Sequence, residues 1–168
     1  MADSPRETGA WGGSVPLPPE ISRGGAMDIL LVEDSEDDSA FFIHALKDSN
    51  PEAQLLIARD GVRALSLIFG AGNPDEAVPA VRPKLIVLDL KLPKVSGLEV
   101  LRKLKTNPHT RTIPVVVLSS SQEKRGLAES YQLGVNSYLV KPMDFDEFAE
   151  LVRILGRYWL QFNQSAKL

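Results

Sequence analysis

Five short, mostly apolar runs recur along the chain, and each is followed by a segment with helical spacing. The runs cover residues 29–32, 55–58, 85–88, 115–118 and 137–140. In the run from Leu85 to Leu88, four branched apolar residues follow one another without alternation. This pattern is typical of a strand that is buried on both faces, as in a parallel sheet.

The segments between the runs predict helices. Apolar residues recur every three or four positions, as at Leu98, Leu101 and Leu104. The first expected helix begins at Asp34 or Ser35, and the last begins at about 144. The three helices between them are expected at about 61–69, 97–105 and 122–133. Five strands alternating with five helices predict a single α/β domain. We expect a five-stranded parallel sheet, flavodoxin-like and doubly wound, with right-handed crossovers and helices on both faces.

Three segments stand apart from this alternation. Residues 1–26 contain five Gly and four Pro without periodicity, which predicts a flexible leader and makes Met27 a candidate natural start. Residues 70–83 predict a long loop, which is unusual in a compact domain. Residues 158–168 form a tail that continues the last helix. Its aromatic residues Tyr158, Trp159 and Phe162 either form a docking or dimer surface or close the helix over the core.

Composition narrows the function classes. The 168 residues are 43% hydrophobic and 24% charged, which is ordinary for a globular protein of one domain. The net charge of -3 does not favour nucleic acid, and the basic cluster of Arg102, Lys103, Lys105 and Arg111 is interpreted as a solvated helix face and turn. The absence of cysteine excludes disulfides and thiolate sites and is compatible with a reducing cytoplasm. No apolar run is long enough for a membrane span, so we expect a cytoplasmic protein without membrane partners.

Polar groups end four of the five predicted strands. Glu33 and Asp34 follow the first strand, Asp89 the third, Ser119 the fourth and Lys141 the fifth. Ligands bind at this edge of open α/β sheets. Three neighbouring carboxylates repel one another unless a cation is present, and Mg²⁺ prefers such hard oxygen ligands. With a lysine and a hydroxyl added, the set predicts a site for a phosphoryl group, with Asp89 as the nucleophile that forms an aspartyl phosphate.

Residues 27–157 resemble the receiver domain of two-component response regulators. The resemblance rests on Glu33-Asp34 after the first strand, Asp89 with Pro93 and Gly97 four and eight residues on, Ser119 after the fourth strand, and Lys141-Pro142 after the fifth. It implies a signalling protein that catalyses only its own phosphorylation and slow dephosphorylation.

The resemblance also implies roles for single residues. Asp89 is the expected phosphoacceptor. Asp34, Asp89 and the backbone carbonyl of Lys91 would bind Mg²⁺, and Glu33 would act through a metal-bound water. Ser119 and Lys141 would contact the phosphoryl group.

A conformational switch is implied as well. Tyr138, three residues before Lys141, matches the switch aromatic of the family, and the peptide bond between Lys141 and Pro142 is expected to be cis. Phosphorylation would draw Ser119 toward Asp89, admit the ring of Tyr138 and alter the surface of the fourth and fifth helices. Lys91 departs from the commonest pattern, because its charge would border the path of an attacking water, so we expect an altered aspartyl-phosphate lifetime.

The expected partners follow from this resemblance. They are a sensor histidine kinase and a downstream protein target or phosphotransfer protein. The long loop and the aromatic tail are similar to those of the small receivers that partner phytochrome-type histidine kinases. Only about eleven residues follow the receiver region, so we expect a stand-alone receiver. A homodimer could form through the fourth helix, fifth strand and fifth helix with the C-terminal aromatics.

Three other classes were weighed. A flavodoxin-like nucleotide-binding protein would need a glycine- or hydroxyl-rich loop after the first strand, where this chain has acids at 33, 34 and 36–38. An aspartate-dependent phosphohydrolase would carry its nucleophile after the first strand. A receiver-fold interaction module that acts without phosphorylation remains the alternative, although its usual mark is the loss of a site residue and none is lost here.

Overall fold

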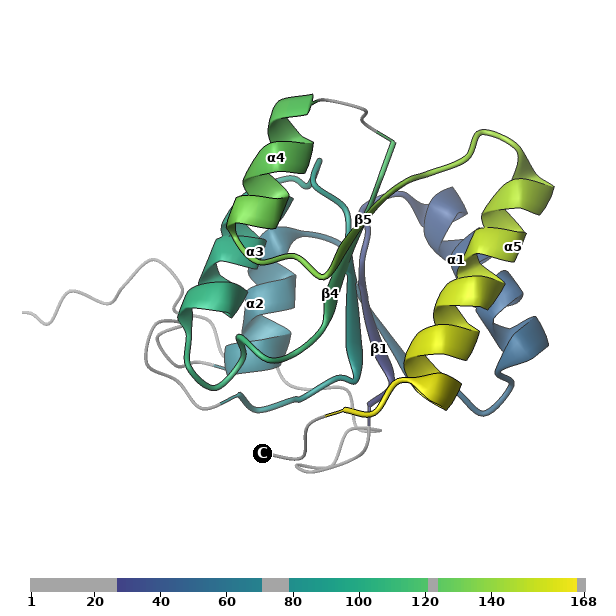
Figure 1. Cartoon of the computed structure of the whole chain (residues 1–168), viewed down its shortest axis with the longest axis horizontal. Helices are drawn as coiled ribbons and strands as arrows, with labels where there is room; N and C mark the ends of the chain where they lie inside the picture. Colours follow the sequence, from purple (N-terminus) through teal and green to yellow (C-terminus); the bar gives the residue numbers. More distant parts are fainter. Residues whose placement is uncertain (1–26, 71–78, 121–123, 166–168) are drawn as a thin grey trace, which may run out of the picture.

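The computed structural model describes residues 27–70, 79–120 and 124–165 (Figure 1). Five strands alternate with five helices, as the sequence predicts. The elements are β1 Ile29–Val32, α1 Glu36–Ser49, β2 Leu55–Ala58, α2 Gly61–Phe69, β3 Leu85–Leu88, α3 Gly97–Thr106, β4 Val115–Ser119, α4 Lys124–Gln132, β5 Ser137–Val140, α5 Phe145–Gly156 and the π-helix η1 Arg157–Phe162.

The strands form one parallel sheet in the order β2-β1-β3-β4-β5. Helices α2, α3 and α4 cover one face, and α1 and α5 cover the other (Figure 1). Strand β3 lies at the centre of the sheet, with Val32 of β1 opposite Leu88. The carboxyl ends of β1 and β3 are therefore level, so the residues that follow them meet at one edge. The predicted doubly wound fold is confirmed.

Burial on both faces explains the unbroken apolar runs. Within β3, Ile86 and Leu88 belong to the core beneath α2, α3 and α4, whereas Leu85 and Val87 belong to the core beneath α1 and α5. All four residues are fully buried. A polar residue at any of them would be desolvated, so the pattern leaves the strand end as the first place for a functional carboxylate.

The ends of the helices follow their capping residues. The Oγ of Ser35 accepts from the backbone N–H of Asp38 and caps α1, so Ser35 is the N-cap of the two candidates. Helix α4 is described from Lys124, and the predicted start at 122 lies outside the described residues. The same is true of residues 1–26 and of most of the predicted loop at 70–83.

The final helix runs past Trp159, as expected, but its last six residues are a π-helix. Trp159 and Leu160 pack against the core beneath α1 and α5, whereas Tyr158 and Phe162 are exposed. The aromatic tail thus both closes the core and presents rings to solvent. No helix among the described residues is long and apolar enough to span a membrane.

Candidate functional site

Three carboxylates meet at the carboxyl edge of the sheet. Glu33, Asp34 and Asp89 each offer an oxygen, and these atoms lie within 4.8 Å of one another. Glu33 and Asp89 are buried, whereas Asp34 is exposed. Such a cluster of hard oxygen donors, open on one side, fits a small divalent cation that keeps part of its water shell. The sequence-predicted acidic residues are thus brought together.

Lys141 lies at the centre of this charge cluster. Its Nζ donates to Glu33 Oε2 (2.5 Å), Asp38 Oδ2 (2.8 Å) and Asp89 Oδ2 (3.1 Å), and its side chain is only 8% exposed. Burial by itself would lower the pKa of Lys141, but the hydrogen bonds that it donates to Asp38 and Glu33 and the charge of Asp89 outweigh burial and raise this pKa above its usual value. The lysine therefore remains a cation beside Asp89.

Glu33 experiences the opposite balance. Burial raises the pKa of Glu33 above its ordinary value, even though Lys141 and the backbone N–H of Ser35 stabilise its ionised form. Desolvation thus makes the Glu33 carboxylate costly to ionise. A carboxylate must be ionised to bind a metal, and a bound cation would stabilise the ionised form of Glu33.

The β3–α3 loop is folded tightly around Asp89. The backbone N–H of Lys91 donates to Asp89 Oδ1 (3.1 Å), so the backbone of Lys91 lies against the carboxylate. The N–H of Gly97 donates to the carbonyl of Leu90 (3.0 Å) and closes the loop. Lys94 adopts a positive φ of 66°, and its Nζ pairs with buried Asp60 (2.5 Å) at the start of α2. These contacts hold the loop, and with it both oxygens of Asp89, in place.

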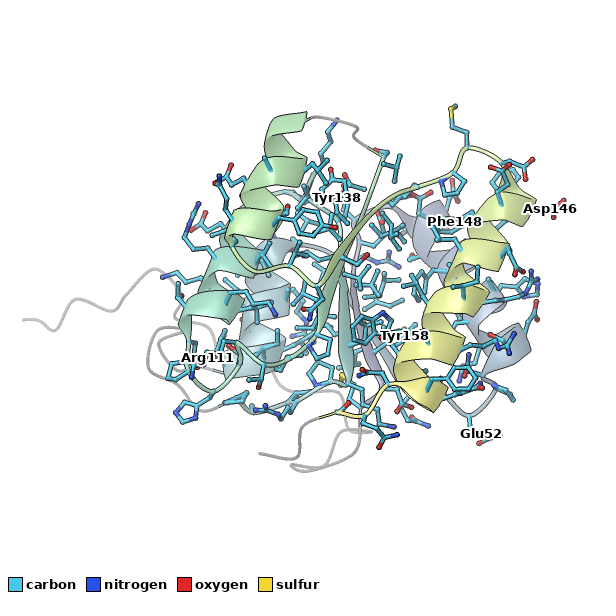
Figure 2. All side chains as sticks on the ribbon, viewed as in Figure 1. Glu52, Arg111, Tyr138, Asp146, Phe148 and Tyr158 are labelled. Atoms are coloured by element: carbon cyan, nitrogen blue, oxygen red, sulfur yellow. The ribbon has the colours of Figure 1, made fainter. Side chains whose placement is uncertain are left out.

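The predicted switch residues lie on neighbouring strands. Ser119 ends β4 and is fully buried. Tyr138 in β5 is opposite Val117 of β4, is half-buried and packs against the core beneath α2, α3 and α4. Figure 2 shows its ring between β5 and α4, and a β-carbon at Gly126 of α4 would lie 3.9 Å from its hydroxyl.

Two sequence-based expectations are wrong, one beside the site and one at the opposite edge of the sheet. The described peptide bonds are all trans, including the one between Lys141 and Pro142, which was expected to be cis. Trans is the intrinsically preferred isomer before proline. Lys105, assigned to a solvated basic face, instead donates its Nζ to the carbonyls of Arg111 and Ile113 and to Asn136 Oδ1, and burial lowers its pKa to about 8.

Two residues that contact the site were missed by the sequence analysis. Asp38 binds Lys141, and Arg59 Nη1 donates to the carbonyls of Glu33 (3.3 Å) and Ser35 (3.1 Å) and to Ser39 Oγ (2.6 Å). In the sequence, Asp38 is one of several acidic residues in the first turn of a predicted helix. The sequence gives no signal that separates Asp38 from Glu36 and Asp37, which lie in the same turn of α1.

A doubly wound parallel sheet with clustered carboxylates and a buried lysine at one edge defines a domain built to handle a phosphoryl group. Comparison with known proteins gives the family: residues 29–153 match the response regulator receiver domain. The chain belongs to this family and is a signalling protein of the two-component type.

Individual relatives agree with this assignment. Response regulator Rcp1 of Synechocystis sp. (strain PCC 6803) is 41% identical over 133 residues, which cover 79% of this chain and 88% of Rcp1. The structure of the phosphorylated cyanobacterial phytochrome response regulator RcpA superposes with a TM-score of 0.77 at 34% identity, covering 84% of this chain and 99% of RcpA. The Mn²⁺-bound form of Rcp1 gives a TM-score of 0.75 at 38% identity, with the same coverage of both chains.

Proposed function

We propose that Asp89 accepts a phosphoryl group from a phosphohistidine of a sensor histidine kinase. A carboxylate oxygen of Asp89 would attack the phosphorus, a P–O bond would form, and the P–N bond would break with its electron pair returning to the imidazole nitrogen. The observation that carries this proposal is the buried Asp89 carboxylate, 3.1 Å from the Lys141 ammonium and within the acidic cluster. The protein would catalyse only this transfer and slow dephosphorylation of its own aspartate.

The proposed metal is Mg²⁺, with Glu33, Asp34, Asp89 and the backbone carbonyl of Lys91 as its ligands, Glu33 acting through a water. The proximity of the three carboxylates and the Mn²⁺-bound form of the relative Rcp1 support this set. When bound, Mg²⁺ offsets negative charge on the transferred group. Lys141 would neutralise a second phosphoryl oxygen, and Ser119 would donate to a third.

The proposed output is a conformational change of the surface formed by α4, β5 and α5. Movement of Ser119 toward the phosphorylated Asp89 would free space for the ring of Tyr138. The surface carries exposed apolar side chains at Leu127, Tyr131, Val140 and Ile154, and Tyr158 of the adjoining η1 is exposed as well. These residues support a protein partner or a homodimer through this face together with the C-terminal aromatics.

The proposed kinase is of the phytochrome type. RcpA is a cyanobacterial phytochrome response regulator, and the similarity covers nearly all of that chain. The downstream partner would be a target protein or a phosphotransfer protein rather than nucleic acid or a membrane, and the proposed location is the cytoplasm. The proposed organisation is a leader (1–26), the receiver domain (27–157) and the tail (158–168).

The test is transfer of labelled phosphate from a phosphorylated phytochrome-type kinase to the wild-type chain and to Asp89→Asn. Transfer to the wild type alone is expected. Equal labelling of both would overturn the role of Asp89. Specific binding of the kinase or a target without any transfer would instead favour the phosphorylation-independent interaction module.

A further inference from the structure

Lys141 is held by a third carboxylate that belongs to a helix. Asp38 lies in the first turn of α1, and its Oδ2 is 2.8 Å from Lys141 Nζ although 103 residues separate the two in the chain. The carboxylates that cluster as a cation site are Glu33, Asp34 and Asp89, and Asp38 is not a member of that group. Its contact with Lys141 is therefore additional to the carboxylates proposed to bind the metal.

The three N–H donors of the ammonium group explain why this contact matters. In the structure they point to Glu33, Asp38 and Asp89. The proposed function assigns Glu33 to the metal and Asp89 to the phosphoryl group. In the phosphorylated protein both carboxylates would be engaged elsewhere, whereas Asp38 keeps its position and can still hold Lys141.

Local contacts fix where Asp38 lies. Its backbone N–H is capped by Ser35 Oγ (3.2 Å) at the start of α1. Three residues on, the ring of Phe41 stacks on Phe145 of α5 with the centroids 4.4 Å apart. This contact ties the first turns of α1 to the start of α5, close after Lys141 in the chain. The anchor and its lysine thus sit on elements that are packed together.

We propose that Asp38 is a positioning residue for phosphoryl transfer: it holds Lys141 Nζ beside Asp89, so that the ammonium group is in place to donate to the incoming phosphoryl oxygen. The inference rests on the proposed role of Asp89. Without Asp38, the lysine would lose the one anchor that the described residues give it outside the metal and phosphoryl groups, and its cation would spend less time where charge develops.

The experiment compares Asp38→Ala, Asp38→Asn and the matched control Asp37→Asn. Asp37 is an exposed acid in the same turn of α1. Its variant therefore removes the same negative charge from the same end of the helix. The rate of phosphorylation by acetyl phosphate is measured at saturating Mg²⁺. We expect Asp38→Ala to be slower than the control by about fivefold or more, because a charge-assisted hydrogen bond is lost. Asp38→Asn, which keeps an acceptor oxygen, should recover part of the rate.

Nuclear magnetic resonance of lysine ammonium groups separates positioning from a general structural effect. The Lys141 signal should persist in Asp37→Asn and Asp38→Asn and broaden or shift in Asp38→Ala, with the rest of the spectrum retained. A rate for Asp38→Ala equal to or above that of the Asp37→Asn control would overturn the inference, since Asp38 would then be neutral or a competitor of the phosphoryl group. Uptake of phosphate by Asp89→Asn would instead contradict the proposed function.

Discussion

Gly97, the first residue of α3, packs against the backbone of Asp89 so closely that a β-carbon at position 97 would overlap the Asp89 carbonyl oxygen. The hydrogen bond from the Gly97 N–H to the Leu90 carbonyl closes the same turn. The loop that follows Asp89 is therefore shaped by the absence of a side chain at its far end.

Gly97→Ala is expected to destabilise the fold by about 2 kcal/mol or more, because backbone atoms must move to admit the methyl group. Urea unfolding measures the change. Gly126→Ala in α4 is the matched control. Its β-carbon would meet the tip of the Leu90 side chain at 3.3 Å and the Tyr138 hydroxyl at 3.9 Å, both ends of side chains, and helix propensity favours alanine by up to about 1 kcal/mol. Equal losses in both variants would show that close approach to Asp89 is not the cause.

Asp60 ties α2 to the loop that follows Asp89. Its Oδ1 accepts from the backbone N–H of Arg63 (2.7 Å) as the N-cap of α2, and its Oδ2 pairs with Lys94. Asp60→Ala should cost about 1 to 2 kcal/mol of unfolding free energy, chiefly through the lost cap. Asp60→Asn, which keeps a capping oxygen, should cost less, because the partner lysine is largely exposed. Urea unfolding of the two variants gives the comparison, and the reverse order would contradict the capping role.

The same carboxylate predicts a pH dependence of stability. Burial by itself would raise the pKa of Asp60, but Lys94 and the backbone N–H donors outweigh burial and lower this pKa below its usual value. The unfolded chain therefore binds the proton more readily, and stability rises with pH through this range. We expect the contribution of Asp60 to be present above pH 3.8 and to be lost as the pH falls through the folded-state pKa. Thermal unfolding of the wild type and Asp60→Asn against pH measures it, and parallel curves for the two proteins would refute it.

Glu33 predicts a pH dependence of metal binding. Burial raises the pKa of Glu33, and a cation binds the ionised form, so affinity for Mg²⁺ should rise with pH through this raised pKa. Calorimetric titration between about pH 5 and pH 8 measures the affinity for Mg²⁺. As the pH is lowered, this affinity should begin to fall at a higher pH than it would if Glu33 had the ordinary glutamate pKa. Glu33→Gln should bind more weakly with a flatter profile, whereas Glu36→Gln, an exposed acid of α1, should keep the wild-type profile. An unchanged profile in Glu33→Gln would remove Glu33 from the metal site.

The side chain of Lys91 is expected to affect the lifetime of the aspartyl phosphate. Its backbone N–H binds Asp89 Oδ1, and its side chain is exposed at the mouth of the site. The aspartyl phosphate of the Lys91→Asn variant should hydrolyse several-fold faster than that of the wild type, because the shorter side chain uncovers the path of the attacking water. Lys91→Met, which keeps the length without the charge, separates blocking from electrostatics. Hydrolysis is measured as the loss of phosphate from the protein after the donor is removed. An unchanged rate in Lys91→Asn would show that position 91 has no such effect.

The sheet and the central charges were predictable for a simple physical reason. An unbroken apolar run such as residues 85–88 favours burial on both faces, and its alternation with helical segments favours a parallel sheet covered by helices. Parallel strands then bring their carboxyl ends together, so Glu33 and Lys141 meet although 108 residues separate them. Their contact follows from topology rather than from any local signal.

The contact of Asp38 could not be predicted in this way. Acids at 36, 37 and 38 are all explained by the positive end of α1, and only the rotation of that helix decides which one reaches Lys141. Likewise, the isomer of the Lys141–Pro142 bond depends on tertiary context, and the observed trans form is the intrinsic preference. Such features depend on how elements pack, which the pattern along the chain does not encode.

Phosphate uptake at Asp89 is the most direct test of the account. The protein is incubated with acetyl phosphate, with and without Mg²⁺, and its intact mass is measured beside that of Asp89→Asn. We predict one added phosphoryl group on the wild type in the presence of Mg²⁺, and none without the metal or in the variant. An added group on Asp89→Asn would contradict the assignment of Asp89, and no uptake by a wild-type protein shown to bind Mg²⁺ would contradict the phosphorylation switch itself.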